Sequence, residues 1–234
     1  MTTRLKTLGL IGGMSWESSA EYYRIINQGV RDRLGPTASA RLVLWSFDFS
    51  EIAALQAAGD WDEIDRQMVD AASRLEAAGA DLLVICTNSV HKSAPAIEAA
   101  STLPLLHIVD PCARALKADG HAKVGLLGTA FTMEQSFYRA RLEEQHGLEV
   151  LIPGDEDRAE VHRVIYEELV TGRIEPASRE AYRAVIARLV ERGATAVILG
   201  CTEIMLLVGP DDSPVPLYDT TRLHAEAAVK AALA

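Results

Sequence analysis

Short apolar runs alternate with longer amphipathic segments along most of the chain. The apolar runs have the length of strands and lie at 8–11, 42–47, 81–85, 124–127 and 196–199. The segments between them carry apolar residues at helical spacing. Because parallel strands are joined by helical crossovers, this alternation predicts an α/β fold with parallel sheets flanked by helices.

The predicted helices begin and end at recognisable signals. The first runs from about Trp16 to Leu34, and Gly35-Pro36 ends it. Two helices follow the second apolar run and are separated near Gly59-Asp60. Further helices are predicted at 133–144, 158–170, 179–192 and from about 220.

The two halves of the chain resemble each other. The matching segments are Gly9–Gly12 with Gly125–Gly128, Tyr22 with Tyr138, and Gly79–Thr87 with Gly193–Thr202. Glycine-rich apolar strands resemble one another in many proteins, but a Cys-Thr pair at the same strand end in both halves favours a true repeat. The period is too long for a solenoid, so we expect two pseudo-symmetric α/β lobes.

The C-terminal segment indicates where the boundaries between the two lobes lie. A strand-like segment at 215–218 and a final helix come after the second lobe is complete. We therefore expect the C-terminal segment to return to the first lobe. The predicted first lobe comprises residues 1–112 and 218–234, and the second comprises 113–217.

Cysteines stand at the strand ends where parallel sheets bind ligands. Cys86 and Cys201 follow directly after the matched strands. A helix start after a thiol favours its anion, so we expect a lowered thiol pKa at both positions. Cysteine is also a small hydrophobe that is often buried, but the matched Cys-Thr pairs favour chemistry. Cys112 has no counterpart and is expected to be a structural thiol.

The turn Gly12-Gly13-Met14-Ser15 opens a helix directly after a strand. Its glycines allow the backbone to approach a ligand, and the helix start offers N–H groups to an anion. The G-x-G-x-x-G fingerprint of dinucleotide sites is absent, because Ile11 stands where the second glycine belongs. A small carboxylate fits this turn better than a nucleotide, and a plain structural turn is the alternative.

Other site types find little support. The spacing of Cys86 and His91 does not match a zinc motif, and no G-x-S-x-G elbow occurs. His91-Lys92 is expected in the exposed first turns of a helix. The acidic run at 154–157 is expected to form a solvated loop and helix start.

Charge and composition limit the classes of molecule that the protein is expected to bind. The 234-residue chain has a formal net charge of −10, which disfavours nucleic acid and anionic membrane surfaces. No apolar run approaches the roughly 18 residues of a membrane-spanning helix, and the N-terminal residues lack a signal-peptide layout. Three cysteines make no disulfide framework. These features predict a protein of the reducing cytoplasm.

Two cysteine motifs together resemble the aspartate/glutamate racemase family. They are Ile85-Cys86-Thr87-Asn88-Ser89 and Leu199-Gly200-Cys201-Thr202-Glu203, and the opening segment Gly9–Trp16 adds to the match. The resemblance runs through essentially the whole chain. It is nearest to the branch of aspartate and broad-specificity amino-acid racemases.

The resemblance implies a mechanism and an assembly. It implies an active site in the cleft between the lobes, a homodimer, a role in D-amino acid metabolism, and no pyridoxal phosphate, metal or nucleotide. It also implies that one of the two thiols, Cys86 or Cys201, removes the α-proton of a small amino-acid substrate and that the other protonates the opposite face. The residues that the resemblance places around the substrate are Met14, Ser15, Gln56, Thr87, Asn88, Thr129 and Thr202.

Two positions depart from the patterns of relatives. Glu203 follows the second Cys-Thr, where cell-wall glutamate racemases carry a histidine. The segment Ser46–Glu51 lacks the arginine that reads the distal carboxylate in some aspartate racemases. We therefore expect a racemase of aspartate, glutamate or a related polar amino acid such as homoserine. A two-cysteine isomerase of hydantoins or small dicarboxylates and a non-catalytic amino-acid-binding protein are the alternatives.

Overall fold

The chain divides into two compact units. The computed structural model describes residues 5–234. The first unit contains the residues up to His107 together with His224–Ala234, and the second contains Ile108–Leu223. These boundaries differ from the predicted 112/113 and 217/218, because helix α5 (Val109–Ala118) lies wholly in the second unit and helix α11 (Thr220–Leu233) begins there.

The first unit is built on a four-stranded parallel sheet with strand order β2-β1-β3-β4. Its strands are β1 (Leu8–Gly12), β2 (Leu42–Ser46), β3 (Leu82–Ile85) and β4 (Leu105–Leu106). Its helices are α1 (Trp16–Leu34), α2 (Phe49–Ala58), α3 (Trp61–Ala77), the 3₁₀ helix η1 (Ser89–Ser93), α4 (Ala94–Ala100) and the later part of α11.

Side-chain caps fix where the helices of this unit begin. Ser15, Asp48 and Asp60 precede α1, α2 and α3, and each side chain accepts a hydrogen bond from a backbone N–H of the first turn. Such caps satisfy donors that have no partner within the helix. Gly59 adopts a left-handed conformation that ends α2. The break predicted near Gly59-Asp60 is therefore confirmed.

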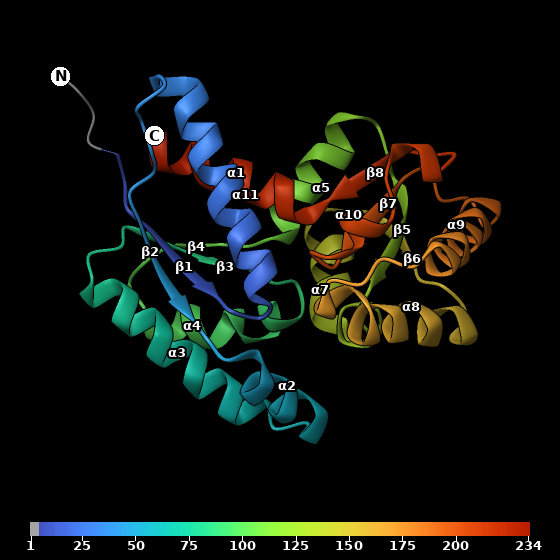
Figure 1. Cartoon of the computed structure of the whole chain (residues 1–234), viewed down its shortest axis with the longest axis horizontal. Coiled ribbons are helices and arrows are strands. Elements are labelled where there is room, and N and C mark those ends of the chain that lie inside the picture. Colours follow the sequence, from blue (N-terminus) through green and yellow to red (C-terminus); the bar gives the residue numbers. More distant parts are fainter. Residues whose placement is uncertain (1–4) are drawn as a thin grey trace. The chain divides into compact units, whose positions relative to one another are not determined.

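Strand alternation gives this sheet two buried faces. Leu10 and Val84 pack with residues of α1 and α11 on one face, whereas Ile11 and Ile85 pack with residues of α3 on the other. Figure 1 shows α1 and α11 on one side of the sheet and α3 and α4 on the other. Since both faces are covered, the strands are continuously apolar.

The second unit repeats this plan. Its four parallel strands have the order β6-β5-β7-β8, which is equivalent to the order in the first unit. They are β5 (Lys123–Gly128), β6 (Glu149–Leu151), β7 (Val197–Gly200) and β8 (Leu217–Asp219). Helices α8 (Asp155–Glu167) and α9 (Pro176–Glu191) contact β5, and α5 contacts β8. The α/β fold with two similar halves is confirmed.

One predicted helix is broken. The segment predicted as a helix at 133–144 consists of α6 (Ala130–Glu134), α7 (Ser136–Ala140) and the π-helix η2 (Arg141–Gln145). Gln135 separates α6 from α7 because its backbone is extended, with φ −81° and ψ 147°. The remaining short elements of this unit are η3 (Leu169–Thr171), α10 (Ile204–Leu207) and η4 (Pro210–Asp212).

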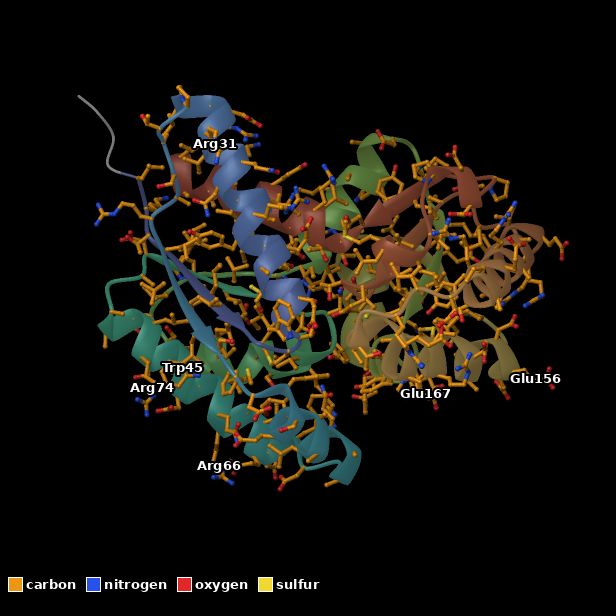
Figure 2. The ribbon with its side chains drawn as sticks, viewed as in Figure 1. Arg31, Trp45, Arg66, Arg74, Glu156 and Glu167 are labelled. Carbon is orange, nitrogen blue, oxygen red and sulfur yellow. The ribbon has the colours of Figure 1, made fainter. Side chains whose placement is uncertain are left out.

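Charged side chains lie on the outer faces of the helices. Figure 2 labels several of them, including Arg66 and Arg74 on α3 and Glu156 and Glu167 on α8. The Arg74 guanidinium lies over the Trp45 ring, 4.9 Å from its centroid. Across residues 5–234, no helix combines the length and the apolar character needed to cross a bilayer.

Candidate active site

Cys86 occupies the carboxyl end of β3, at the centre of the first sheet. Its backbone N–H donates to the carbonyl of Ile11 on β1 at 2.8 Å, which fixes the residue to the neighbouring strand. The side chain is fully buried on the face covered by α1 and α11. The thiol lies 3.9 Å from the carbonyl oxygen of Val84, its hydrogen-bond acceptor.

The turn after β1 lies beside Cys86 because β1 and β3 pair in register. Gly13 has φ +84°, and a Cβ at this position would lie 2.3 Å from the carbonyl oxygen of Phe47, so only glycine fits. The Ser19 hydroxyl accepts from the Gly13 N–H at 2.7 Å and donates to the Ser15 carbonyl at 3.0 Å. Met14 and Ser15 are buried in this turn.

Three further predicted residues belong to the same unit. Thr87 and Asn88 follow Cys86 directly, and both are buried. Gln56, near the end of α2, is also buried, and its side-chain amide donates to the hydroxyl of Ser89 at 3.4 Å. This bond ties α2 to the turn that carries the thiol. The structure therefore gathers Gln56, Thr87 and Asn88 in one part of the first unit.

His91 is not in the exposed helical turn that the sequence predicts. Its ring is 1% exposed, and its Nδ1 donates to the carbonyl oxygen of Thr87 at 2.6 Å. His107 and His224 are also buried, with ring centroids 4.6 Å and 5.7 Å from that of His91. We call these three residues the histidine cluster. They escape prediction because His91 is in η1, His107 follows β4 and His224 is in α11, so no single sequence motif contains them.

In the second unit, Cys201 and Thr129 stand at neighbouring strand ends. Gly128 pairs with Gly200, so the next residues, Thr129 and Cys201, follow adjacent strands β5 and β7. Thr129, Cys201 and Thr202 are all buried. The Thr129 hydroxyl lies within hydrogen-bond distance of the Thr132 hydroxyl, at 3.3 Å, in the first turn of α6.

Glu203 makes direct contact with the second thiol, although the sequence did not place it in the site. The Cys201 thiol donates to Glu203 Oε2 at 2.9 Å, and the Thr202 hydroxyl donates to the same oxygen at 2.7 Å. The Glu203 side chain is buried. Its position directly after Cys-Thr is the available signal, but the difference from the histidine of other relatives does not by itself reveal the contact with the thiol.

Helix α8 contributes Tyr166 to the surroundings of the second thiol, and His162 lies beside Tyr166 on the same helix. Burial, and then the charges of Cys201 and Glu203, raise the pKa of Tyr166 to about 12, so its hydroxyl stays neutral. The His162 ring lies 4.7 Å from the Tyr166 ring between centroids, and its Nδ1 accepts from the Ala130 N–H at 3.2 Å. No motif marks either residue, and only their spacing of one helical turn links them.

The thiol pKa values shift opposite to the sequence prediction. Burial raises the pKa of Cys86, and burial followed by the Glu203 carboxylate raises the pKa of Cys201. Desolvation of the thiolate outweighs the helix starts, because a 3₁₀ helix follows Cys86 and α10 after Cys201 is a single turn. Both thiols are therefore protonated at neutral pH unless a neighbour accepts the proton.

Comparison with known proteins assigns the family. A sequence model described as Asp/Glu/Hydantoin racemase matches residues 11–228. The chain belongs to this racemase family. Racemases are isomerases, so the family places the chain among enzymes of that class. In this racemase family member, Cys86 and Cys201 directly follow the matching central strands β3 and β7.

Individual relatives of this chain are also named as racemases of this kind. A crystal structure from Yersinia pestis assigned to the Asp/Glu racemases is 54% identical and covers 98% of this chain and 100% of its own, with a TM-score of 0.92. An aspartate racemase homologue from Pyrococcus horikoshii is 32% identical, covering 97% and 99%, with a TM-score of 0.84. The broad specificity amino-acid racemase RacX of Bacillus subtilis is 25% identical over 178 residues, 75% of each chain.

The third cysteine of this racemase family member lies in the core. Cys112, on α5, is 1% exposed and packs within the main hydrophobic cluster of the second unit. Burial raises the pKa of its thiol, with a smaller effect from Asp219. These surroundings favour the structural role that the sequence predicts. Within residues 5–234, no three His, Cys, Asp or Glu side chains are grouped so as to hold a metal ion.

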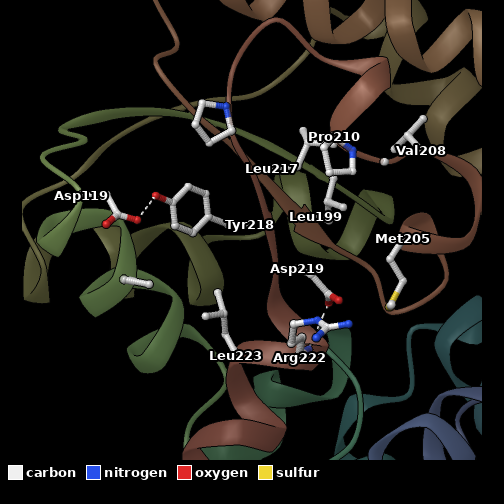
Figure 3. A pocket seen from close by; sticks show the side chains of 13 residues that line it. Asp119, Leu199, Met205, Val208, Pro210, Leu217, Tyr218, Asp219, Arg222 and Leu223 are labelled. Atoms are coloured by element: carbon white, nitrogen blue, oxygen red, sulfur yellow. Dashed lines mark hydrogen bonds between the residues drawn. The ribbon is translucent and has the colours of Figure 1, made fainter. Parts of the chain in front are cut away.

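A separate pocket lies beside β8 in the second unit (Figure 3). Its volume is about 620 Å³, and apolar side chains such as Met205, Val208 and Leu223 form most of its wall. The Tyr218 hydroxyl donates to Asp119 across one side at 2.6 Å. None of the predicted site residues lines this pocket. The pocket is therefore distinct from the candidate catalytic residues.

Proposed function

We propose that this protein racemises a free polar α-amino acid, such as aspartate, glutamate or homoserine, without pyridoxal phosphate or a metal. The observation that carries the proposal is the matched placement of two buried thiols. Cys86 and Cys201 each follow a central strand in sheets of equivalent strand order. Ligands of parallel sheets bind at this edge. The names of the relatives, which include aspartate and broad-specificity amino-acid racemases, support the substrate class.

Two thiols suit racemisation because the reaction needs a base on one face of Cα and an acid on the other. In one direction, one cysteine acts as thiolate and takes the α-proton, while the other acts as thiol and gives its proton to the opposite face. The reverse direction exchanges their roles. In this proposal Cys86 and Cys201 act on opposite faces of one bound substrate.

Glu203 supplies a proton acceptor for the second thiol. A buried thiol is a poor base until it loses its proton, and the 2.9 Å bond from Cys201 leads that proton to the Glu203 carboxylate. The proton transfer converts a thiol and a carboxylate into a thiolate and a carboxylic acid, with no change of total charge. Glu203 thus makes Cys201 available as the base for one enantiomer.

The substrate carboxylate must be held by donors, because the carbanion forms without an electron sink. The turn at Ser15 opens the 19-residue helix α1, where backbone N–H groups and the partial positive charge of the helix attract anions. Thr129 stands at the matching strand end of the second unit, where its hydroxyl can act as a further donor. Met14, Gln56, Thr87, Asn88 and Thr202 complete the proposed binding set.

The direct test is loss of optical rotation. Purified enzyme, dialysed against a chelator and free of pyridoxal phosphate, is incubated with L-aspartate, L-glutamate or L-homoserine, and circular dichroism follows the signal to zero. Loss of signal with any of them supports the proposal. If none of the twenty common amino acids loses its rotation or exchanges its α-proton in heavy water, the proposal is wrong.

The family description names a second substrate class, the hydantoins. A 5-substituted hydantoin carries an acidic proton on a stereocentre that the same pair of thiols could exchange. Chiral chromatography of a 5-substituted hydantoin after incubation separates this activity from racemisation of the free amino acid.

The homodimer expected from the resemblance also stays a prediction, which light scattering in solution tests.

A further inference from the structure

Several hydrogen bonds hold the segment that follows Cys86, among them the bond from the His91 N–H to the Asn88 carbonyl at 3.2 Å. Strand β3 ends at Ile85, and η1 begins only at Ser89. The intervening Cys86–Asn88 turn is anchored at its start by the bond from the Cys86 N–H to Ile11. At its other end, the Thr87 carbonyl accepts the short 2.6 Å bond from His91 Nδ1. His91 therefore sets the orientation of the peptide that follows Thr87.

The His91 ring is itself held on several sides. The ring is buried, with His107 tilted against it at 59° and His224 against it at 64°. A backbone carbonyl only accepts, so Nδ1 of His91 carries a proton whatever the charge of the ring. The donor to Thr87 is consequently always present.

His224 is fixed by two hydrogen bonds of its own. Its Nε2 donates to the Leu106 carbonyl at 2.8 Å, which leaves Nδ1 of the neutral ring to accept from the Tyr22 hydroxyl at 2.8 Å. Tyr22 is fully buried in α1. Tyr22, His224 and His91 thus form a supported column that ends at the Thr87 carbonyl.

A planar peptide transmits this constraint toward the thiol. Fixing the Thr87 carbonyl also fixes the N–H of Asn88 on the opposite side of the same plane. Thr87 and Asn88 are proposed substrate ligands, and Cys86 is one residue away. A displacement of about 1 Å at a reacting group can cost about 100-fold in rate. The hydrogen bond from His91 therefore bears on the geometry of the whole turn.

We propose that His91 is a positioning residue for the first catalytic thiol: its Nδ1–H holds the Cys86–Asn88 turn in the geometry that proton transfer by Cys86 requires. The proposal rests on the function proposed above. A purely structural histidine would stabilise the fold and leave each folded molecule fully active. A positioning residue affects the chemical step in the molecules that do fold.

Two substitutions separate the hydrogen bond from the packing. His91→Asn places an amide N–H near the position of Nδ1 and keeps the donor, although it leaves a cavity. His91→Leu fills the space better but has no donor. His121→Asn is the matched control, because His121 contacts the Thr195 hydroxyl at 3.0 Å in the second unit and no proposed site residue.

We expect turnover to be lost in the variant without a hydrogen-bond donor at position 91 and to be kept in the variant that has one. Per folded molecule, kcat of His91→Leu should fall by about 10- to 100-fold with a smaller change in KM. His91→Asn should keep kcat within roughly fivefold of the wild-type value, since its donor remains, and His121→Asn should be unchanged. Circular dichroism and urea unfolding give the folded fraction of each variant.

Isotope effects show which thiol is affected. If Cys86 is misplaced, the primary effect of an α-deuterium on kcat/KM should rise for the enantiomer that Cys86 deprotonates. The effect should fall for the other enantiomer, because protonation by Cys86 then limits the rate. Loss of folded protein alone leaves both effects at their wild-type values. If His91→Leu does not fold, Tyr22→Phe is the second variant, because it removes the hydrogen bond from the Tyr22 hydroxyl to His224 at nearly constant volume. It should shift the isotope effects of the two enantiomers in the same opposite directions, but by less.

Three sets of results distinguish the positioning role of His91 from its alternatives. Retained turnover in both His91 variants, or equal losses with unchanged isotope effects, would overturn the positioning role while leaving the racemase function intact. If the wild-type protein racemises no substrate, the proposed function itself is wrong and the inference falls with it. Loss in His91→Leu, retention in His91→Asn and opposite isotope shifts for the two enantiomers support it.

Discussion

Replacing Glu203 by glutamine tests the pairing of Cys201 with its carboxylate. The substitution keeps size and an acceptor oxygen near the thiol, but it removes the charge and the ability to take the proton. A positioned side chain that accepts a proton contributes about 100- to 10,000-fold to the rate. We expect kcat to fall by about 100-fold, at the lower end of this range, because the thiol of the variant can still ionise to solvent.

A second effect opposes this loss. The Glu203 charge is one cause of the raised pKa of Cys201, so its removal makes the thiolate easier to form. Burial is the larger cause and remains in the variant, so the thiol stays protonated near neutral pH. The lost acceptor should dominate. Because the thiol must then ionise to solvent, kcat of the variant should rise more steeply with pH than wild-type kcat.

The assay follows racemisation by circular dichroism across a pH series, with the folded fraction measured in parallel. Glu168→Gln is the matched control, because Glu168 is an equally buried carboxylate of the same unit that binds Ser178 and Arg163. That variant should lose stability but keep its turnover per folded molecule. A Glu203→Gln enzyme with wild-type turnover and an unchanged pH profile would refute the proton-accepting role.

Three other substitutions have expected outcomes. Cys112→Ser buries a hydroxyl in an apolar cluster and should lower the free energy of unfolding by about 1–3 kcal/mol in urea titrations, with racemisation per folded molecule unchanged. Gly13→Ala forces a Cβ against Phe47 at positive φ and should cost about 2–4 kcal/mol, seen as a lower thermal midpoint. Burial lowers the pKa of His162, so the unfolded chain takes up its proton at higher pH and stability falls as the pH drops below about 6.5. His162→Phe, which keeps the ring contacts, should flatten this part of the slope in urea titrations at several pH values.

Most of the fold was predictable because it depends on local patterns. The alternation of apolar runs with amphipathic segments identified β1, β3, β5 and β7, and the bounds of α1 agree with the prediction at both ends. Strands β4 and β6 were missed, since they contain only two and three residues and are too short to show a period. The break at Gln135 was missed because no glycine or proline marks it.

The candidate site was predictable where motifs are contiguous in the sequence. Cys86 and Cys201 were found from matched strand ends, and the structure places both there. The sign of their pKa shifts was wrong, because a sequence shows helix starts but not the depth of burial. The histidine cluster could not be predicted, since His91, His107 and His224 meet only after η1, β4 and α11 have packed.

The central claim, that two thiols act on opposite faces of Cα, is tested most directly by Cys86→Ser and Cys201→Ser in heavy water. Proton NMR follows loss of the α-proton signal from each enantiomer, and circular dichroism follows racemisation in the same samples. Both variants should lose racemisation in both directions, because a serine hydroxyl is a far weaker acid than a thiol. Each should keep slow exchange with only one enantiomer, and the two variants should favour opposite enantiomers. Racemisation at the wild-type rate in either folded variant would contradict the account.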